Sequence, residues 1–188
     1  LTVTGISTES NAATTYSKTN TGATNVLLTA SDNNWSVTAT NLNADISNSI
    51  KYAGALTVTG ISTEANVSTT YSKSNTGASS VILEASDGTW SVEDGALNTD
   101  LGNDFKYLGD LTVTGIATGN KTAALTDYTT AKTGATTNTL TANDAWSLTK
   151  ATLDTALGAG VRFAGNLTVT SGISDEASAL TAYTKSIT

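Results

Sequence analysis

Cysteine, histidine, proline and methionine are all missing from this 188-residue sequence. A chain without cysteine forms no disulfide. Without cysteine and histidine it also lacks the ligands of a structural zinc site and the common nucleophiles and bases of covalent catalysis. Charged residues are scarce, at 13% of the chain. No apolar run approaches the roughly 18 residues that a membrane-spanning helix needs, so we expect no membrane span in this segment.

Threonine, by contrast, is abundant, with 39 residues, and glycine contributes 16. This composition favours strands and turns over long helices. The formal net charge is −7 and the pI is near 4.3. An acidic chain is repelled by phosphates, so we expect neither nucleic acid nor an anionic membrane surface as a partner.

The motif Leu-Thr-Val-Thr occurs four times at nearly constant spacing. It begins at Leu1, Leu56, Leu111 and Leu167, which are 55, 55 and 56 residues apart. A fixed long period indicates an array in which one structural unit is repeated. The copies expected from this period are residues 1–55, 56–110 and 111–166, with a partial fourth copy at 167–188. Because the sequence has no initiator methionine and stops within that fourth copy, we expect a segment of a longer repetitive protein.

Each copy begins with a strand pattern. Leu1 and Val3 alternate with polar neighbours, the period of two that is typical of a strand with one buried face. A polar arm follows at residues 7–21, either irregular or a short helix. A second strand is expected at residues 24–30, and a turn then leads to a short strand that carries Trp35.

The last part of each copy has helical spacing. In the first copy Leu42, Ile46 and Ile50 recur at intervals of four residues, which predicts a helix with one apolar face. The equivalent residues of the next two copies are Leu97, Leu101 and Phe105, then Leu153, Leu157 and Val161. Asp94 is the expected N-cap in the second copy. Glycines at positions 54, 109 and 165 are the expected stop signals.

These patterns predict a mainly β fold with short helices. A separate domain of about 55 residues buries little apolar surface, and here it has no disulfide or metal to stabilise it. We therefore expect an elongated, solenoid-like tandem array of units of about 55 residues, in which each copy buries its apolar face against the next. The alternative is a string of small independent β modules.

Leu-Thr-Val-Thr-Gly strands, followed by turns rich in alanine, threonine and asparagine and by short Ala/Leu helices, resemble the repeats of large secreted bacterial surface proteins. These include surface-layer-like and adhesin-like β-strand-repeat proteins. The resemblance covers essentially the whole chain. It implies an extracellular coat, filament or adhesion role, frequently with calcium involved. This chain departs from the calcium-binding RTX repeats, because their Gly-Gly-x-Gly-x-Asp motif is absent.

Three tryptophans recur once per copy and are the most distinctive candidate site residues: Trp35, Trp90 and Trp146. Exposed in a ladder, they would stack on sugar rings, as aromatic platforms do in carbohydrate-binding proteins. Alternatively, each is the largest core residue of its copy. The valine or leucine two residues later, on the same strand face, favours the core role, and glycan binding is the alternative.

Aspartates recur in the turns before the tryptophans, at Asp32, Asp87 and Asp144. Calcium prefers six to eight oxygen ligands, often from several carboxylates of one loop. Each of these turns supplies one recurring acid, and none has the EF-hand spacing. An aspartate at the start of a turn is explained by hydrogen bonds to its own backbone. We therefore expect turn residues and no cofactor, with calcium binding as the alternative.

Catalytic residues are not expected. Glycoside hydrolysis needs two carboxylates at a defined separation in a cleft. Glu9 and Glu64 recur, but the third copy has Gly119 or Asn120 at that position. The chain is therefore predicted not to be an enzyme.

A lysine follows each of the recurring arm tyrosines: Lys18, Lys73, Lys132 and Lys185. These lysines are either contact points between chains or the solvated ends of the arms. Together, the sequence features predict a structural segment of a larger extracellular surface-layer, filament or adhesin-stalk protein. Its expected partners are other copies of itself, which assemble through the faces of the repeats. The alternative is a carbohydrate- or calcium-dependent adhesin module that binds cell-surface glycans.

Overall fold

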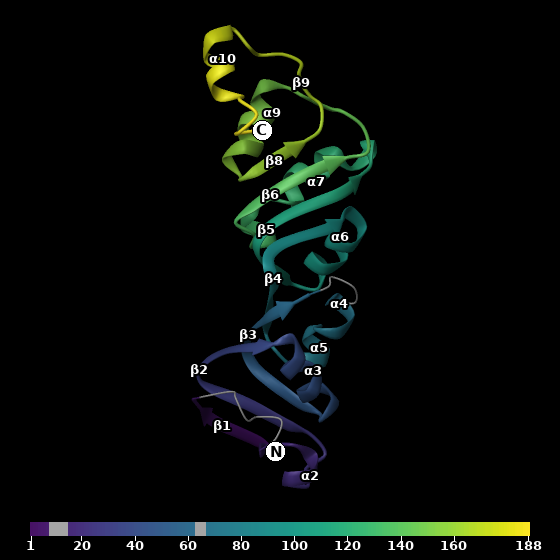
Figure 1. Cartoon of the computed structure of the whole chain (residues 1–188), viewed down its shortest axis with the longest axis vertical. Helices are drawn as coiled ribbons and strands as arrows, with labels where there is room; N and C mark the ends of the chain where they lie inside the picture. The colour runs from purple at the N-terminus through teal and green to yellow at the C-terminus, as the bar shows by residue number, and fades with distance from the viewer. Residues whose placement is uncertain (8–14, 63–66) are drawn as a thin grey trace. The chain divides into compact units, whose positions relative to one another are not determined.

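The computed structural model describes residues 1–7, 15–62 and 67–188, which form an α/β fold (Figure 1). Helix accounts for 34% of them and strand for 41%. The strands are β1 (Thr2–Ile6), β2 (Val26–Thr38), β3 (Ile50–Ile61), β4 (Ser80–Glu93), β5 (Phe105–Ile116), β6 (Thr137–Ala142), β7 (Trp146–Leu148), β8 (Val161–Ala164) and β9 (Leu167–Val169). The helices are α2 (Lys18–Thr21), α3 (Ala39–Ser47), α4 (Val67–Thr70), α5 (Lys73–Thr76), α6 (Asp94–Gly102), η1 (Thr118–Asn120), α7 (Lys121–Asp127), α8 (Thr130–Thr133), α9 (Lys150–Gly158) and α10 (Glu176–Ala182).

Seven strands form one sheet in the order β1-β2-β3-β4-β5-β6-β8, and β7 pairs with β9. The pairs β1–β2, β2–β3, β3–β4, β5–β6, β6–β8 and β7–β9 are all parallel. The expected fold class is therefore wrong. The chain is an α/β protein with one seven-stranded parallel sheet, and it is neither an elongated solenoid-like array nor a string of independent β modules.

The physical reason lies in the connections between strands. Two parallel strands cannot be joined by a tight hairpin, so the chain must cross from the end of one strand to the start of the next. In the first copy α3 makes this crossover between β2 and β3. The helical spacing visible in the sequence thus belongs to the crossover connections that a parallel sheet requires.

The chain divides into two compact units. The first comprises residues 1–88 and 99–108, and the second comprises residues 89–98 and 109–188. Their limits differ from those of the sequence copies. The boundary between the first two copies falls inside β3, and the next boundary falls inside β5. The Leu-Thr-Val-Thr motifs that begin at Leu56 and Leu111 are therefore the second halves of longer strands, which begin in the preceding copies.

Gly54 bends β3 at the copy boundary. Its φ of 101° lies in the left-handed region, and a Cβ here would lie 2.2 Å from the Asn33 carbonyl oxygen. Only glycine fits such a close approach. Gly109, within β5, has a φ of 96°. The expectation that these glycines stop the preceding helices is wrong, because both lie inside strands.

The helices of the first three copies, α3, α6 and α9, have nine residues each. Thr38 caps α3, and its hydroxyl oxygen accepts a hydrogen bond from the Asn41 amide at 3.2 Å. Thr149 caps α9 in the same way. The expected N-cap Asp94 is instead the first residue of α6. Its carboxylate is therefore available for the side-chain contacts described below.

These helices end earlier than the sequence spacing predicts. The third apolar residue of each triplet, Ile50 in the first copy, begins the next strand. Ser49 and Asp104 precede two of these strands with φ of 59° and 61°, and Gly160 precedes the third with φ of 75°. A residue with left-handed backbone conformation ends the helix, and the next strand begins directly after it. The apolar spacing of the sequence therefore extends past the end of the helix into the strand.

In the first unit the large apolar side chains of the strands lie on one face of the sheet. Those with no exposed surface include Val26, Leu28, Leu56, Val58, Val81 and Leu83. Residues that alternate with them, such as Thr57, are half-buried on the opposite face. Helices α3 and α5 pack on β3 (Figure 1). Since Leu42 of α3 is also fully buried, the core lies between these helices and the apolar face.

Candidate functional site: the contacts between consecutive copies

Each of the first three copies contains a four-residue helix that begins two residues after its recurring tyrosine, and the fourth copy has a hydrogen-bonded turn at the same place. We call these segments the arm turns: residues 16–22, 71–77, 128–134 and 183–188. In the second, the Asn75 amide donates to Ser72 Oγ at 3.3 Å, and the Thr76 hydroxyl donates to the Ser72 carbonyl at 3.1 Å. Gly77, with φ of 77°, ends the turn. Serine or threonine before the turn and glycine after it explain why so short a helix forms here.

The tyrosine of an arm turn contacts the helix of the preceding copy. Tyr71 has a side-chain hydrogen bond with Asn43 of α3. Tyr128 bonds Asp94 and Asn98 of α6. In the fourth copy, Tyr183 donates to Asp154 of α9 at 2.5 Å. Asn43, Asn98 and Asp154 occupy the same helix position, so one contact recurs at all three junctions between copies.

A second contact holds the other end of the arm turn. The Lys51 ammonium on β3 donates to the backbone carbonyls of Ser74 and Asn75. On β8, Arg162 Nη1 donates to the equivalent carbonyls, those of Ser186 at 2.8 Å and Ile187. A cation is favourable there because the last carbonyls of a helical turn carry partial negative charge. We use the term receiving site for three residues of one copy. They are the helix residue that bonds the arm tyrosine, the residue four positions before it, and the basic strand residue that bonds the arm carbonyls.

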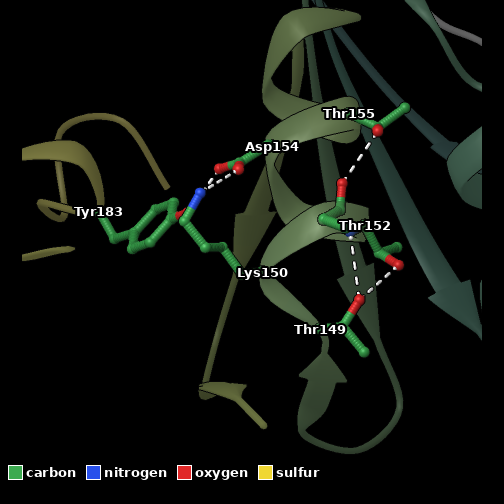
Figure 2. A network of polar contacts seen from close by, with 7 residues as sticks. Thr149, Lys150, Thr152, Asp154, Thr155 and Tyr183 are labelled. Atoms are coloured by element: carbon green, nitrogen blue, oxygen red, sulfur yellow. Dashed lines mark hydrogen bonds and ion pairs between the residues drawn. The ribbon is translucent and has the colours of Figure 1, made fainter. Parts of the chain in front are cut away.

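The receiving site that binds the fourth copy consists of Lys150, Asp154 and Arg162. Lys150 Nζ lies 2.5 Å from Asp154 Oδ2, and Tyr183 approaches the other carboxylate oxygen (Figure 2). Lys150, and then Tyr183, hold the pKa of Asp154 below its usual range. Asp154 in turn raises the pKa of both Lys150 and Tyr183. The Lys150 and Asp154 side chains are 42% and 45% exposed, so this ion pair contributes little to stability.

The corresponding contact of the third copy is buried. Tyr128, which is 1% exposed, donates to the Asp94 carboxylate at 2.5 Å and contacts the Asp94 carbonyl at 3.0 Å. Asn120 Nδ2 donates to the same carboxylate at 2.9 Å. Burial, and then the Asp94 charge, raise the pKa of the Tyr128 hydroxyl. The contact between copies thus differs in burial: the Tyr128–Asp94 hydrogen bond is buried, whereas the cluster of Tyr183, Asp154 and Lys150 is exposed.

A different tyrosine–aspartate pair lies inside single copies. The Tyr52 hydroxyl donates to Asp45, and the Tyr107 hydroxyl donates to Asp100, and all four side chains are buried. In the third copy both members change together, to Phe163 and Ala156. This joint replacement between copies is the sequence signal for the pair, because both positions change in the same copy.

The three tryptophans are buried: Trp35 is 3% exposed, Trp90 is 2% and Trp146 is 0%. The Trp35 ring meets Tyr52 edge to face at 4.9 Å, and Trp146 meets Phe163 in the same geometry. This burial is what the core interpretation predicts. It leaves none of the three rings open for stacking on a sugar.

The three candidate calcium ligands are exposed, but only Asp144 lies in a bend between strands, whereas Asp32 lies within β2 and Asp87 within β4. The expectation that all three are turn residues is therefore wrong for Asp32 and Asp87. Asp32 Oδ1 accepts the Asn34 amide at 3.0 Å, the bond expected of a turn aspartate. Asp144 pairs with Lys121 at 2.5 Å, and this hydrogen bond, followed by one from Thr118, lowers the pKa of Asp144. Asp87 is exposed in β4. In the part of the chain that the structure describes, no three acidic side chains gather as a metal site.

The remaining sequence candidates are two glutamates and the arm lysines. Glu9 and Glu64 lie outside the described residues. Lys73 pairs with Asp104 at 2.5 Å, which lowers the pKa of Asp104, and Lys132 pairs with Asp127 at 3.0 Å. These ion pairs are exposed, as expected of solvated arm ends.

Helices α7 and α9 border an open groove of about 300 Å³. Its lining residues are Thr122, Leu125, Thr126, Ala151, Thr152, Thr155 and Ala156. None of these is charged, and Figure 2 shows Thr149, Thr152 and Thr155 bonded along α9 itself. The groove is therefore lined by apolar groups and threonine hydroxyls, with no charged side chain among its lining residues.

Among residues 1–7, 15–62 and 67–188, no helix has the length and apolarity needed to cross a bilayer. No protein-family model, curated protein or solved structure matches this chain. The function is therefore argued from the contacts themselves.

Proposed function

We propose that this chain is a non-enzymatic structural segment of a larger extracellular protein, such as a surface layer, filament or adhesin stalk, and that it associates with other copies of itself. One observation supports the proposal. The polar residues that recur with the period of the sequence join each copy to the next. A basic residue on the strand and a polar helix residue hold the arm turn that follows, as Lys51 and Asn43 do for residues 71–77.

This use of the repeating residues favours a mechanical role over catalysis or ligand binding. A binding repeat would present its recurring aromatic and acidic side chains to solvent, whereas here the tryptophans pack into the core. The resemblance to the repeats of secreted bacterial surface proteins supports a place outside the cell. The same resemblance supports assembly with other copies as the partner interaction.

Negative-stain microscopy and thermal melting of the full chain test this proposal. We expect ordered assemblies at high protein concentration without added ligand, and a melting temperature that neither calcium nor glycans raise. A calcium- or glycan-dependent adhesin module behaves in the opposite way, because ligand binding stabilises the folded state by mass action. A chain that stays monomeric and melts several degrees higher with calcium or a glycan would overturn the structural proposal.

A further inference from the structure

Two Asp-Gly sequences occur in the chain, Asp87-Gly88 and Asp94-Gly95. In such a sequence the glycine amide nitrogen can attack the side-chain carboxyl carbon of the aspartate, because glycine has no Cβ to obstruct the approach. The attack forms a new C–N bond, and the amide proton leaves with the carboxyl hydroxyl as water, which gives a cyclic succinimide. Water then breaks either the new bond, which restores aspartate, or the original peptide bond. The second outcome leaves isoaspartate, whose backbone runs through the side chain.

Asp87 and Gly88 lie in the middle of β4, within a stretch of four exposed residues. The strand is buried on both sides of this stretch, at Leu83 with no exposed surface and at Trp90 with 2%. Hydrogen bonds made at an exposed stretch open at a low free-energy cost. The Asp87 carboxyl carbon and the Gly88 nitrogen can therefore approach each other while both buried halves of the strand stay folded.

The equivalent stretch of the first copy departs from the sheet. On β2 the pairing with β3 jumps from Thr29 to Asn34, while on β3 it advances by only two residues, from 53 to 55. This is a bulge in β2. Asn33 in the bulge has a φ of 62°, and Gly88 at the equivalent position of β4 has a φ of 73°. Isoaspartate thus adds its extra backbone atom where the strand is already irregular.

The other sequence, Asp94-Gly95, is constrained. Asp94 is 8% exposed, and its carboxylate accepts hydrogen bonds from Tyr128 at 2.5 Å and from Asn120 at 2.9 Å. It is also the first residue of α6. Ring closure at Asp94 therefore requires these bonds and the first turn of the helix to open together. Such an opening costs more free energy than the opening of an exposed stretch.

We propose that Asp87 is a modification site, at which isoaspartate accumulates in the folded protein while Asp94 stays unmodified. Water is the only co-reactant, and the reaction needs neither an enzyme nor a cofactor. The exposed bulge absorbs the additional backbone atom, so the modified chain stays folded. Because the reaction is spontaneous, the modified fraction grows with the age of the chain. This modification goes beyond the proposed function and does not depend on it.

Ageing the full chain for several weeks at neutral pH, folded and in parallel unfolded in urea, tests the proposal. A protease that cleaves after glutamate separates the two sites, because Glu84 and Glu93 bracket residues 85–93 and Asp94 begins the next peptide. Isoaspartate leaves the peptide mass unchanged but alters its chromatographic retention and its electron-transfer fragmentation.

In the folded chain, isoaspartate is expected to form at Asp87 at least about tenfold faster than at Asp94, because closure at Asp94 waits for local opening. In urea the two rates are expected to converge, since the fold then protects neither site. Far-UV circular dichroism is expected to show that the aged chain, which was not exposed to urea, stays folded.

Gly88→Asn is the matched control. Asparagine occupies this left-handed position in the first copy, and a Cβ at Gly88 would meet no atom within 4 Å. The variant is expected to lose most of the isoaspartate, because a side chain now obstructs the amide nitrogen. Asp87→Asn is expected to react faster than wild type, since the same attack expels ammonia in place of hydroxide.

Equal rates at Asp87 and Asp94 in the folded chain would overturn the proposal, as would a rate at Asp87 that Gly88→Asn leaves unchanged. A difference between the two sites that persists in urea would do the same, because the neighbouring sequence and not the fold would then select the site. Loss of structure in the aged chain would contradict the claim that the bulge absorbs the modification.

Discussion

Two buried carboxylates in this protein are each bonded to a buried tyrosine. Asp45 is 3% exposed and Tyr52 has no exposed surface, and the tyrosine hydroxyl donates to the carboxylate. A buried carboxylate is costly unless hydrogen bonds compensate for lost hydration. The third copy avoids this cost altogether, with Phe163 and Ala156 at the equivalent positions. The two residues of the pair are therefore present together or absent together in each of these copies.

This coupling predicts the outcome of a double-mutant cycle. Tyr52→Phe alone should destabilise the fold by about 1–3 kcal/mol, because it removes a bond from a buried carboxylate. Tyr52→Phe with Asp45→Ala, which imitates the third copy, should be less destabilising than the sum of the single changes by about 0.5–3 kcal/mol. Urea unfolding measures all four free energies. Strict additivity would show that the two side chains do not depend on each other.

The tryptophans differ in how their ring nitrogens are satisfied. Trp35 Nε1 donates to the Ala53 carbonyl at 3.0 Å. The buried Trp146 Nε1 has no acceptor among the described residues. Replacement of tryptophan by phenylalanine removes the N–H in both cases, but only at Trp35 does it break a hydrogen bond and leave a carbonyl without its donor.

Trp35→Phe is therefore expected to cost about 1–3 kcal/mol more than Trp146→Phe, the penalty for an unsatisfied buried polar group. Both rings meet an aromatic neighbour at 4.9 Å, so the loss of aromatic packing is similar. The Lys121 ammonium also lies 5.3 Å from the Trp146 ring centroid, so the comparison is made in the Lys121→Ala background. Chemical denaturation of the two variants measures the difference. Equal losses would indicate that the Trp35 hydrogen bond contributes nothing.

At the scale of elements, the arm turns depend on docking. Helices α2, α5 and α8 have four residues each. Isolated helices of this length are unstable in water, because a single turn fixes several residues for few hydrogen bonds. Side-chain caps offset part of this cost. Bonds from the preceding copy, such as those between Tyr128 and Asp94, stabilise the turn further.

The Tyr128 contact predicts a dependence of stability on pH. The pKa of Tyr128 is raised in the fold above its usual value of 10.0, so the folded hydroxyl stays protonated where the unfolded one ionises. The unfolded state then binds fewer protons, and stability falls as pH rises above about 10 and is fully present below it. Phenylalanine cannot ionise, so a Tyr128→Phe variant lacks this contribution.

The difference in unfolding free energy between wild type and Tyr128→Phe should therefore shrink between pH 8 and pH 11. Urea titrations at these values provide the test, with the m-value checked for constancy. Other tyrosines contribute equally to both proteins and cancel in the comparison. A difference that stays constant over this range would mean that the Tyr128 hydroxyl titrates alike in the folded and unfolded chains.

At the scale of the whole molecule, net charge opposes association. The chain has sixteen acidic and nine basic residues, which gives a formal net charge of −7. Like charges repel over a Debye length of about 10 Å at 0.1 M salt, and this range shortens as salt rises. Copies that associate must overcome this repulsion.

Self-association of the full chain should therefore strengthen as the sodium chloride concentration rises. Sedimentation velocity at low and high ionic strength measures the shift, and sodium sulfate at equal ionic strength controls for ion-specific effects. Weaker association at high salt would show that attractive ion pairs across the contact, rather than net charge, set its strength.

The sequence by itself determined the period of the molecule, the alternation of buried and exposed residues in the strands, and the core character of the tryptophans. Each of these depends on local pattern: Leu56 and Val58 alternate with threonine because one face of the strand is buried. The helices were also visible, although their ends were misplaced, because Ile50 continues the helical spacing into the next strand.

Only the tertiary structure decided how the strands pair and which side chains meet. Parallel pairing joins segments about 25 residues apart, as Leu56 with Val81, and no local pattern specifies such a partner. The contact between Tyr183 and Asp154 also depends on a turn of one copy meeting the helix of another. A repeat motif therefore shows which residues recur, while the free energy of packing between copies determines what those residues touch.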